Sequence, residues 1–227
     1  MSGRLILPGD TRFIDAVDQR ENEHPERAVL LALMDSAVRA PTAQPIDSTC
    51  SRRYTARRDS GRRPLDQIKW IVLHSTEGDT AQGAAAWFAN NDSRGSAHLC
   101  LDDRECYRTL TDNQIPWGAA GANYRGFHIE QAGYARWPTL VWSTTHRKMF
   151  DRSAYKTALH CRKFGIRPYF VSSAGLLKGT PGVTTHKQCS DAFGGSHWDP
   201  GTGWPRYPYM LRVRQWYARL DHVELVG

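Results

Sequence analysis

The sequence lacks several features that would assign it to a common class of protein. No apolar run approaches the roughly 20 residues that a membrane-spanning helix needs. There is no internal repeat, and no HExxH or comparable local metal signature. The beginning of the sequence has too short an apolar stretch for a secretory signal, so we expect synthesis in a cytoplasm without a signal peptide. A chain of 227 residues is then long enough for one full domain and an appendage.

Cysteine is also scarce. The five cysteines contain no CxxC pair, and an odd number leaves one thiol unpaired. This pattern argues against a disulfide framework and against a zinc ribbon. Cys100 and Cys106 flank a predicted tight turn and could approach each other, but free buried thiols are the favoured interpretation.

Positive charge is in excess, with a formal net charge of +7. Part of it is concentrated in one arginine-rich stretch, which consists of Arg52, Arg53, Arg57, Arg58, Arg62 and Arg63. Such a stretch favours contact with polyanions, whether nucleic acid, anionic lipid or an acidic wall polymer, although a solvated linker is the simpler interpretation. No aromatic interleaving or nucleic-acid-binding motif accompanies it, so we expect no specific nucleic-acid recognition.

The chain divides near residue 64. Before it, Pro25–Ala40 has apolar residues at helical spacing and predicts a short helical appendage. A flexible basic linker then leads to a main domain over residues 64–227. The elements predicted there are strands at 68–74, 97–101, 106–110 and 126–131, and helices at 80–90, 144–164 and 207–225. Strands that alternate with helices of this length predict an α/β domain with a mixed central sheet flanked by helices.

Two histidines and an aspartate stand out by their positions. His74 ends an apolar strand, His186 follows a similar segment in a strand-to-loop setting, and Asp199 lies in an Asp-Pro-Gly turn. Each alone is more simply a hydrogen-bonded structural residue. Together they offer two imidazoles and a carboxylate, and three such ligands with an open fourth position are typical of catalytic zinc.

Several short segments occur in an order that is more specific for one protein family than any single segment is. The segments are Ile71–Thr76, Gly95–His98, Pro116–Gly121, Asn123, Ile129–Glu130, Thr185–His186 and His197–Gly201. Over residues 65–205 this order resembles the zinc-dependent N-acetylmuramoyl-L-alanine amidase family, which is related to the peptidoglycan recognition proteins. The segment Phe193–Gly201 is most similar to amidases of phages that infect actinobacteria.

The resemblance implies a fold, an activity and a set of site residues. It implies that His74, His186 and Asp199 bind Zn²⁺ and that Glu130 activates the attacking water. His197 stands where relatives often carry a lysine that stabilises the oxyanion, and a histidine there could act in the same way. The implied substrate is peptidoglycan, cleaved between N-acetylmuramic acid and L-alanine of the stem peptide.

The resemblance also indicates residues of a substrate groove. His98 and Trp117 are expected to line it, with Thr76 and Asn123 as further contributors. Trp117 could equally be a core anchor. Relatives often have a histidine where this sequence has Gly118, which leaves the shape of the groove open.

Several alternatives remain at this point. Glu130 could be a surface strand residue, and Cys189 could compete as a metal ligand. His128 shares a face with Glu130, where a solvated position or one beside a metal ligand is favoured. The protein is expected to be a monomeric phage endolysin that acts on the cell wall after release. A non-catalytic peptidoglycan-binding recognition module and a bacterial wall-remodelling amidase are the alternatives.

Overall fold

The computed structural model describes residues 50–224, and side chains as far as residue 220. The helix predicted at Pro25–Ala40 lies outside the described residues. The described strands are β1 (Arg52–Arg53), β2 (Trp70–Ser75), β3 (Leu99–Leu101), β4 (Cys106–Arg108), β5 (Gly126–Gln131) and β6 (Gly182–Thr185). The described α-helices are α2 (Ala81–Phe88), α3 (Arg147–Lys163), α4 (Ser173–Leu177), α5 (His186–Phe193) and α6 (Arg206–Glu224).

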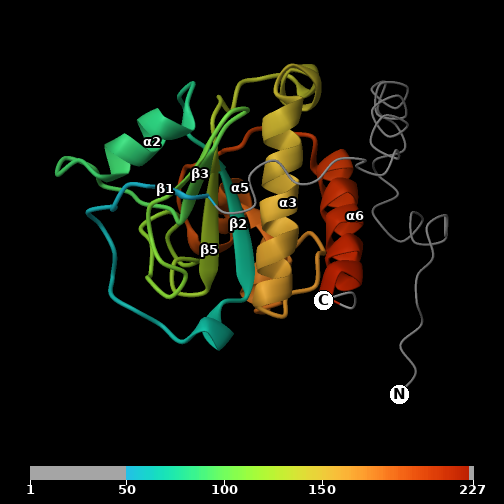
Figure 1. The fold of residues 1–227 in the computed structure, drawn as a ribbon. Coiled ribbons are helices and arrows are strands. Elements are labelled where there is room, and N and C mark those ends of the chain that lie inside the picture. The colour runs from blue at the N-terminus through green and yellow to red at the C-terminus, as the bar shows by residue number, and fades with distance from the viewer. Residues whose placement is uncertain (1–49, 225–227) are drawn as a thin grey trace. The chain divides into compact units, whose positions relative to one another are not determined.

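The six strands form one sheet in the order β1-β4-β3-β5-β2-β6. Only β3 and β4 pair in antiparallel fashion, and the other neighbours are parallel. Helices α3 and α6 lie side by side along one face of the sheet, and α2 lies on the other side (Figure 1). The mixed α/β architecture predicted from the sequence is confirmed.

Strand β2, between β5 and β6, is buried on both faces, and its side chains alternate between two parts of the core. Ile71 and Leu73 pack with residues of α3 and α6 in the largest apolar cluster. Trp70 and Val72 face the opposite side, where they pack with Cys189 of α5. Strand residues alternate between faces, so His74 belongs to the side of Trp70 and Val72.

Helices α2 and α5 each begin after a threonine whose side chain caps them. The Thr80 side chain accepts a hydrogen bond from the backbone N–H of Gly83 and caps α2. The long helix α3 begins at Arg147, after a π-helical turn at Val141–Thr145, and is followed by Gly165 with φ of +66°. The last predicted helix corresponds to α6 within a residue or two.

The arginine-rich stretch is not the flexible linker that its charge predicted. Strand β1 pairs with β4, and Arg63 is only 3% exposed. Arg57 and Arg58 donate hydrogen bonds to backbone carbonyls at the end of α2 and in the loop after it. Carbonyls at a helix C-terminus lack intrahelical partners, so these side chains are held by the domain.

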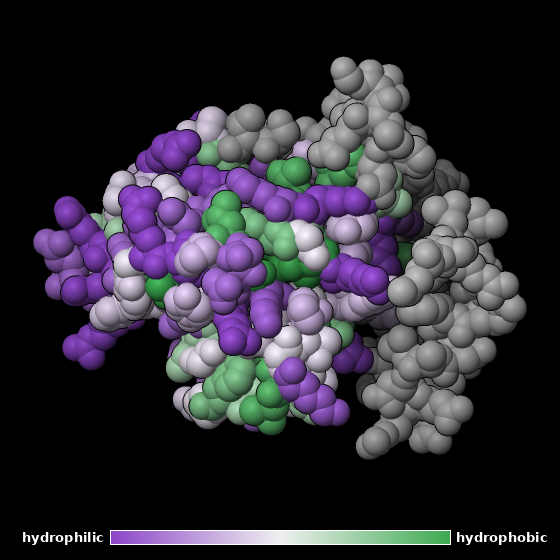
Figure 2. All heavy atoms as spheres, turned by 90° about the horizontal axis from the view of Figure 1, so that it is seen from below, coloured by the Kyte–Doolittle hydropathy of each residue, from purple (hydrophilic) through white to green (hydrophobic). Residues whose placement is uncertain are grey.

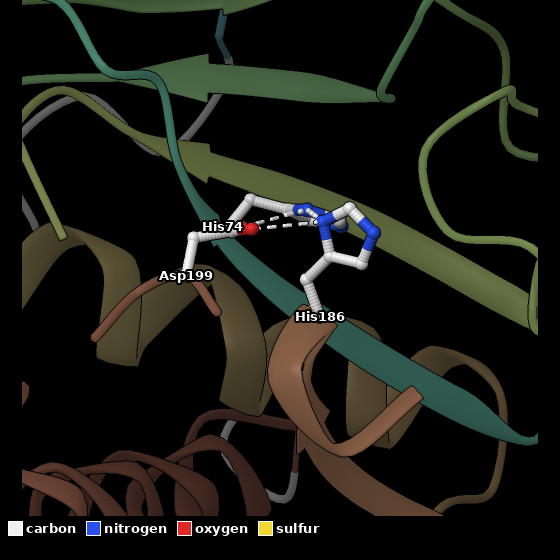
Figure 3. Close-up of side chains that lie close together, drawn as sticks. All are labelled: His74, His186 and Asp199. Carbon is white, nitrogen blue, oxygen red and sulfur yellow. Dashed lines mark hydrogen bonds and ion pairs between the residues drawn. The ribbon is translucent and has the colours of Figure 1, made fainter. Parts of the chain in front are cut away.

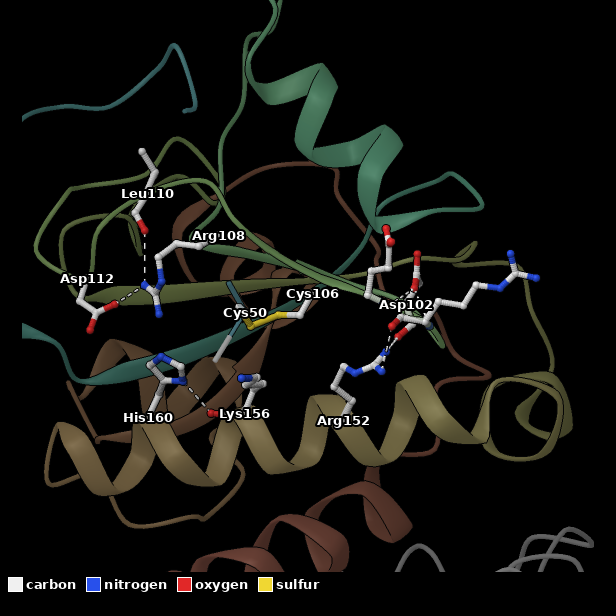
Figure 4. Close-up of a disulfide and its surroundings, with 11 residues drawn as sticks. Cys50, Asp102, Cys106, Arg108, Leu110, Asp112, Arg152, Lys156 and His160 are labelled. Carbon is white, nitrogen blue, oxygen red and sulfur yellow. Dashed lines mark hydrogen bonds and ion pairs between the residues drawn. A yellow bond between two sulfur atoms is a disulfide. The ribbon is translucent and has the colours of Figure 1, made fainter. Parts of the chain in front are cut away.

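The prediction of free thiols is wrong for one pair of cysteines. Cys50 and Cys106 form a disulfide between the sheet and α3, with Cα atoms 4.7 Å apart (Figure 4). The parallel pairing of β1 with β4 brings Cys50 to this position. Cys100 does not pair with Cys106, because Cys106 lies opposite Leu101 and Cys100 opposite Tyr107, so the two side chains leave opposite faces. Cys100, Cys161 and Cys189 are free and buried.

The surface combines charged and apolar residues. The face in Figure 2 shows hydrophilic side chains around smaller apolar patches. The exposed large apolar side chains include Trp87, Trp117, Leu177 and Trp198. Among the described residues, no helix has the length and apolar character to cross a membrane.

Candidate metal centre

Three parallel strands bring the candidate ligands to one edge of the sheet. β2 lies between β5 and β6 and runs parallel to both, so their carboxyl ends share an edge. His74 lies near the end of β2, directly beside Glu130 of β5 in the strand register. His186 follows the end of β6 and is the first residue of helix α5, where a loop had been expected. Ligand sites of open α/β sheets commonly form at such an edge.

The side chains of His74, His186 and Asp199 converge there (Figure 3). Nδ1 of His74 lies 3.2 Å from Nδ1 of His186 and 3.3 Å from Oδ2 of Asp199. Nδ1 of His186 lies 3.0 Å from Oδ1 of Asp199. All three residues are buried, so their polar atoms face one another instead of solvent.

This donor set fits a zinc ion. Tetrahedral donors at the usual zinc distances of about 2.0–2.1 Å are separated by about 3.3–3.4 Å, close to the observed separations. Two imidazole nitrogens and one carboxylate oxygen are also common zinc donors, and they leave a fourth position open. Burial acts to raise the pKa of Asp199, but hydrogen bonds from His186 and His74 hold that pKa well below its usual range. The carboxylate is therefore ionised and ready to bind a cation.

The two ligands that lie outside the sheet are fixed to each other. The backbone N–H of Lys187 donates a 2.9 Å hydrogen bond to the backbone carbonyl of Asp199, which ties the turn to the start of α5. Gly201 has φ of +90°, and a Cβ atom there would collide with the backbone of Ala135. The turn that carries Asp199 therefore needs glycine at this position.

Glu130 is buried beside the ligands and is not the surface strand residue that the sequence left as an alternative. Its Oε2 has no hydrogen-bond partner among the residues that the structure describes. Burial is the largest of the effects that raise the pKa of Glu130 to about 8, and repulsion from the Asp199 carboxylate is the next. A carboxyl group with a pKa near neutrality can both accept and return a proton.

His197 lies on the solvent side of the ligands. Its ring stacks on that of His186 with centroids 4.1 Å apart, and its Nδ1 is 3.8 Å from Oδ1 of Asp199. The side chain is 66% exposed. Partial burial and the neighbouring His186 lower the pKa of His197, although Asp199 opposes the shift. His197 can therefore reach a molecule that enters from solvent.

Three of the residues expected to contact substrate have other partners. His98 is fully buried, where its Nδ1 accepts from the backbone of His128 and its Nε2 lies 3.1 Å from the carbonyl of Gln114, so it has no surface for substrate. The Thr76 hydroxyl donates to the carbonyl of Gly78 in the turn after β2. Oδ1 of Asn123 accepts hydrogen bonds from two backbone N–H groups of the 117–119 loop.

Trp117 is the most exposed of the four residues that were expected to line the groove. The residue is 42% exposed, which excludes the alternative of a core anchor. Its Nε1–H donates to the hydroxyl of Ser60, and the Arg58 guanidinium lies 6.0 Å from the ring centroid. The next residue, Gly118, packs against His128, which in turn contacts His74.

Two further side chains complete the surroundings. His128 is fully buried, which excludes the solvated position, and its Nδ1 lies 2.9 Å from Nε2 of His74. The signal in the sequence was its position two residues before Glu130 on one strand face. Cys189 packs in the core with Trp70 and does not belong to the ligand group. Burial raises the pKa of its thiol to about 12, which disfavours the thiolate that metals bind.

Comparison with known proteins agrees with this architecture. The family model described as N-acetylmuramoyl-L-alanine amidase matches residues 64–202, more than half of the chain. The hydrolase AmiA of Staphylococcus aureus, solved in complex with its ligand, has a TM-score of 0.62 at 18% identity, over 81% of this chain and 97% of that one. A selenomethionine derivative of AmpD has a TM-score of 0.52 at 14% identity, over 76% of this chain and 99% of that one. No curated protein sequence matches the chain.

At these identities the two structures support the fold alone. The family model covers every segment of the candidate centre, from the strand that carries His74 to the turn that carries Asp199. The chain belongs to the N-acetylmuramoyl-L-alanine amidase family.

Proposed function

We propose that this protein is a zinc-dependent peptidoglycan amidase. It cleaves the amide bond between the lactyl group of N-acetylmuramic acid and L-alanine of the stem peptide. Family membership supports amidase activity on peptidoglycan. The single observation that carries the zinc mechanism is the convergence of His74, His186 and Asp199 within bonding range of one cation.

In this proposal the three ligands hold the ion and Glu130 transfers protons. Zinc, when bound, supplies Lewis-acid polarisation of the scissile carbonyl and lowers the pKa of the attacking water. The carboxylate of Glu130 takes the proton of that water and returns it to the leaving amine of L-alanine. Its burial and its missing partner favour this role, because no competing hydrogen bond occupies Oε2.

His197 and Trp117 would act on the substrate from the solvent side. An N–H of His197 can donate to the oxygen that gains negative charge during attack on the amide. Its stacking on His186 orients the ring beside the centre. The exposed ring of Trp117 offers an apolar surface for a sugar or a peptide. Asn123 supports this surface by holding the backbone of the 117–119 loop, and Thr76, which holds the turn after β2, would contribute from beside the centre.

The test is release of stem peptides from purified actinobacterial peptidoglycan, with and without a chelator, and identification of the cleaved bond by mass spectrometry. We expect peptides with a free N-terminal L-alanine, loss of release with chelator, and recovery with added zinc. Binding without cleavage would favour a recognition module. Cleavage that ignores the chelator would refute the zinc mechanism.

We also propose that the biological role is that of a phage endolysin, since Phe193–Gly201 resembles amidases of phages that infect actinobacteria. Purified protein should then lower the turbidity of actinobacterial cells whose outer layers have been permeabilised. A gene surrounded by bacterial wall-synthesis genes would instead favour a wall-remodelling amidase.

Anionic wall polymers are a proposed second partner, through the exposed arginines at positions 52, 53, 57 and 62. Adsorption to cell walls should weaken as ionic strength rises, because salt screens exposed charges. Adsorption that is equal at low and high salt would contradict this contact.

A further inference from the structure

One imidazole beside the candidate centre has no assigned role. Nδ1 of His128 lies 2.9 Å from Nε2 of His74, the ring nitrogen that points away from His186 and Asp199. The two rings are stacked, with an interplanar angle of 23°. The imidazole of this candidate ligand in β2 is therefore hydrogen-bonded to a side chain of the neighbouring strand β5. A second side chain of β5, that of Gln131, donates to the backbone carbonyl of His74.

The ring of His128 is enclosed by backbone on both edges. A Cβ atom on Gly118 would collide with Nδ1 of this ring, and a Cβ atom on Gly126 would collide with Nε2. The backbone of His128 is fixed as well, because its N–H donates to Nδ1 of His98 and its carbonyl accepts from the backbone N–H of His98. The slot between the two glycines thus holds the imidazole against His74.

The direction of the hydrogen bond follows from the chemistry of a neutral imidazole, which carries one N–H. If Nδ1 of His74 gives its lone pair to a metal, its proton is on Nε2, and Nε2 donates to Nδ1 of His128. The proton of His128 is then on its own Nε2. That atom has no hydrogen-bond partner among the described residues.

Packing alone does not explain a histidine at position 128. A buried N–H without a partner is unfavourable, and a leucine or phenylalanine would avoid it. The compensating feature of this ring is the acceptor that it presents to His74. The same strand face carries Glu130 two residues later, so β5 supplies two polar groups to the centre.

We propose that His128 is a positioning residue, which accepts the Nε2–H of His74 and holds that ligand in the tautomer and orientation that bind the metal. The inference rests on the proposed function, because it assumes that His74 binds zinc. Outer contacts of this kind typically change metal affinity by about 10–100-fold.

The test compares His128→Leu with His128→Asn. Asparagine can place its amide oxygen near the position of Nδ1 and keep an acceptor for His74, whereas leucine cannot. His160→Leu is the matched control, because His160 is also a buried imidazole but stacks on Phe127, which faces α3 and α6. Zinc affinity of each purified full-length protein is measured by competition with a chromophoric chelator, together with thermal unfolding of the metal-free form.

We expect zinc affinity to fall by about 10–100-fold in H128L, and to stay within a few-fold of wild type in H128N and in H160L. Equal affinity of H128L and wild type would overturn the proposal, as would H128N that is folded but as weak as H128L. Wild-type protein without zinc affinity would instead refute the metal centre itself.

A second measurement covers the case in which H128L does not fold. Nitrogen-15 NMR of the zinc-loaded wild type reports which ring nitrogen of His128 carries its proton. A proton on Nε2 supports the acceptor role of Nδ1, and a proton on Nδ1 overturns it.

Discussion

Replacement of Glu130 by glutamine should have opposite effects on activity and on stability. The amide keeps the shape of the side chain but cannot accept the proton of the attacking water. General-base contributions are typically about 10²–10⁴-fold, so we expect peptide release to fall by that factor. Zinc binding should persist, because the three ligands are unchanged.

The gain in stability follows from the raised pKa of Glu130, about 8 in the folded protein. The group binds its proton more tightly in the folded state than in the unfolded state, where its pKa is 4.5. The metal-free wild type therefore loses stability as pH rises from about 4.5 to about 8. At pH 7 this linkage amounts to about 3 kcal/mol, and Glu130→Gln removes it.

The assay is urea unfolding of the metal-free proteins at pH 5 and pH 7, with peptide release by the zinc-loaded proteins. Glu105→Gln serves as control, because Glu105 pairs with Arg52 and the Tyr107 hydroxyl away from the centre. Glu130→Gln that retains activity within a few-fold would refute the proton-transfer role. Equal unfolding free energies of the variant and wild type at pH 7 would refute the argument from burial.

Three other perturbations test the rest of the structure. The disulfide joins Cys50 to Cys106 across 56 residues, so the double alanine variant should lose about 4 kcal/mol of unfolding free energy in denaturant titrations; a loss below 1 kcal/mol would contradict this. Burial lowers the pKa of His160 to about 4, so its contribution to stability is present above about pH 6.5 and is lost as pH falls through 4. Between pH 7 and pH 4, wild type should therefore lose about 3 kcal/mol more than His160→Leu, and equal acid sensitivity would exclude this origin. Gly118→Ala should weaken zinc affinity by about 10-fold, because the added methyl group displaces the His128 ring; unchanged affinity would show that the slot has room.

The sequence predicted the elements whose physical signal is local. The apolar run of β2 and the alternation of β5 identified two strands, and β5 was predicted with the observed limits. The helices predicted at 80–90 and 144–164 correspond to α2 (Ala81–Phe88) and α3 (Arg147–Lys163). His74 and His186 stood out by their positions at or after predicted strands, and Asp199 by its Asp-Pro-Gly turn, while the resemblance implied that the three act together.

Features that depend on distant pairing were missed. Strand β1 is only two residues long and is held by its backbone hydrogen bonds to β4. So short a strand has no alternating pattern that could be detected in the sequence. The disulfide depends on this pairing and could not be inferred from cysteine spacing. Arg63 was assigned to a linker because of its charge, although its side chain is buried and its guanidinium donates to the carbonyls of Asn123 and Gly126.

The histidines show why a residue type alone does not indicate a role. His74, His98 and His128 all lie on or beside neighbouring strands and all are buried. Both ring nitrogens of His98 have backbone partners, in His128 and Gln114, so its hydrogen bonds hold strands and loops together. Both ring nitrogens of His74 instead face side chains, with Nδ1 toward His186 and Asp199. In His98 one ring nitrogen accepts a hydrogen bond from backbone and the other donates to backbone, so no lone pair is left for a metal. In His74 the lone pair of Nδ1 can bind a cation, and the proton is then on Nε2. The partner of each nitrogen, which only the folded chain determines, therefore separates the structural histidine from the candidate ligand.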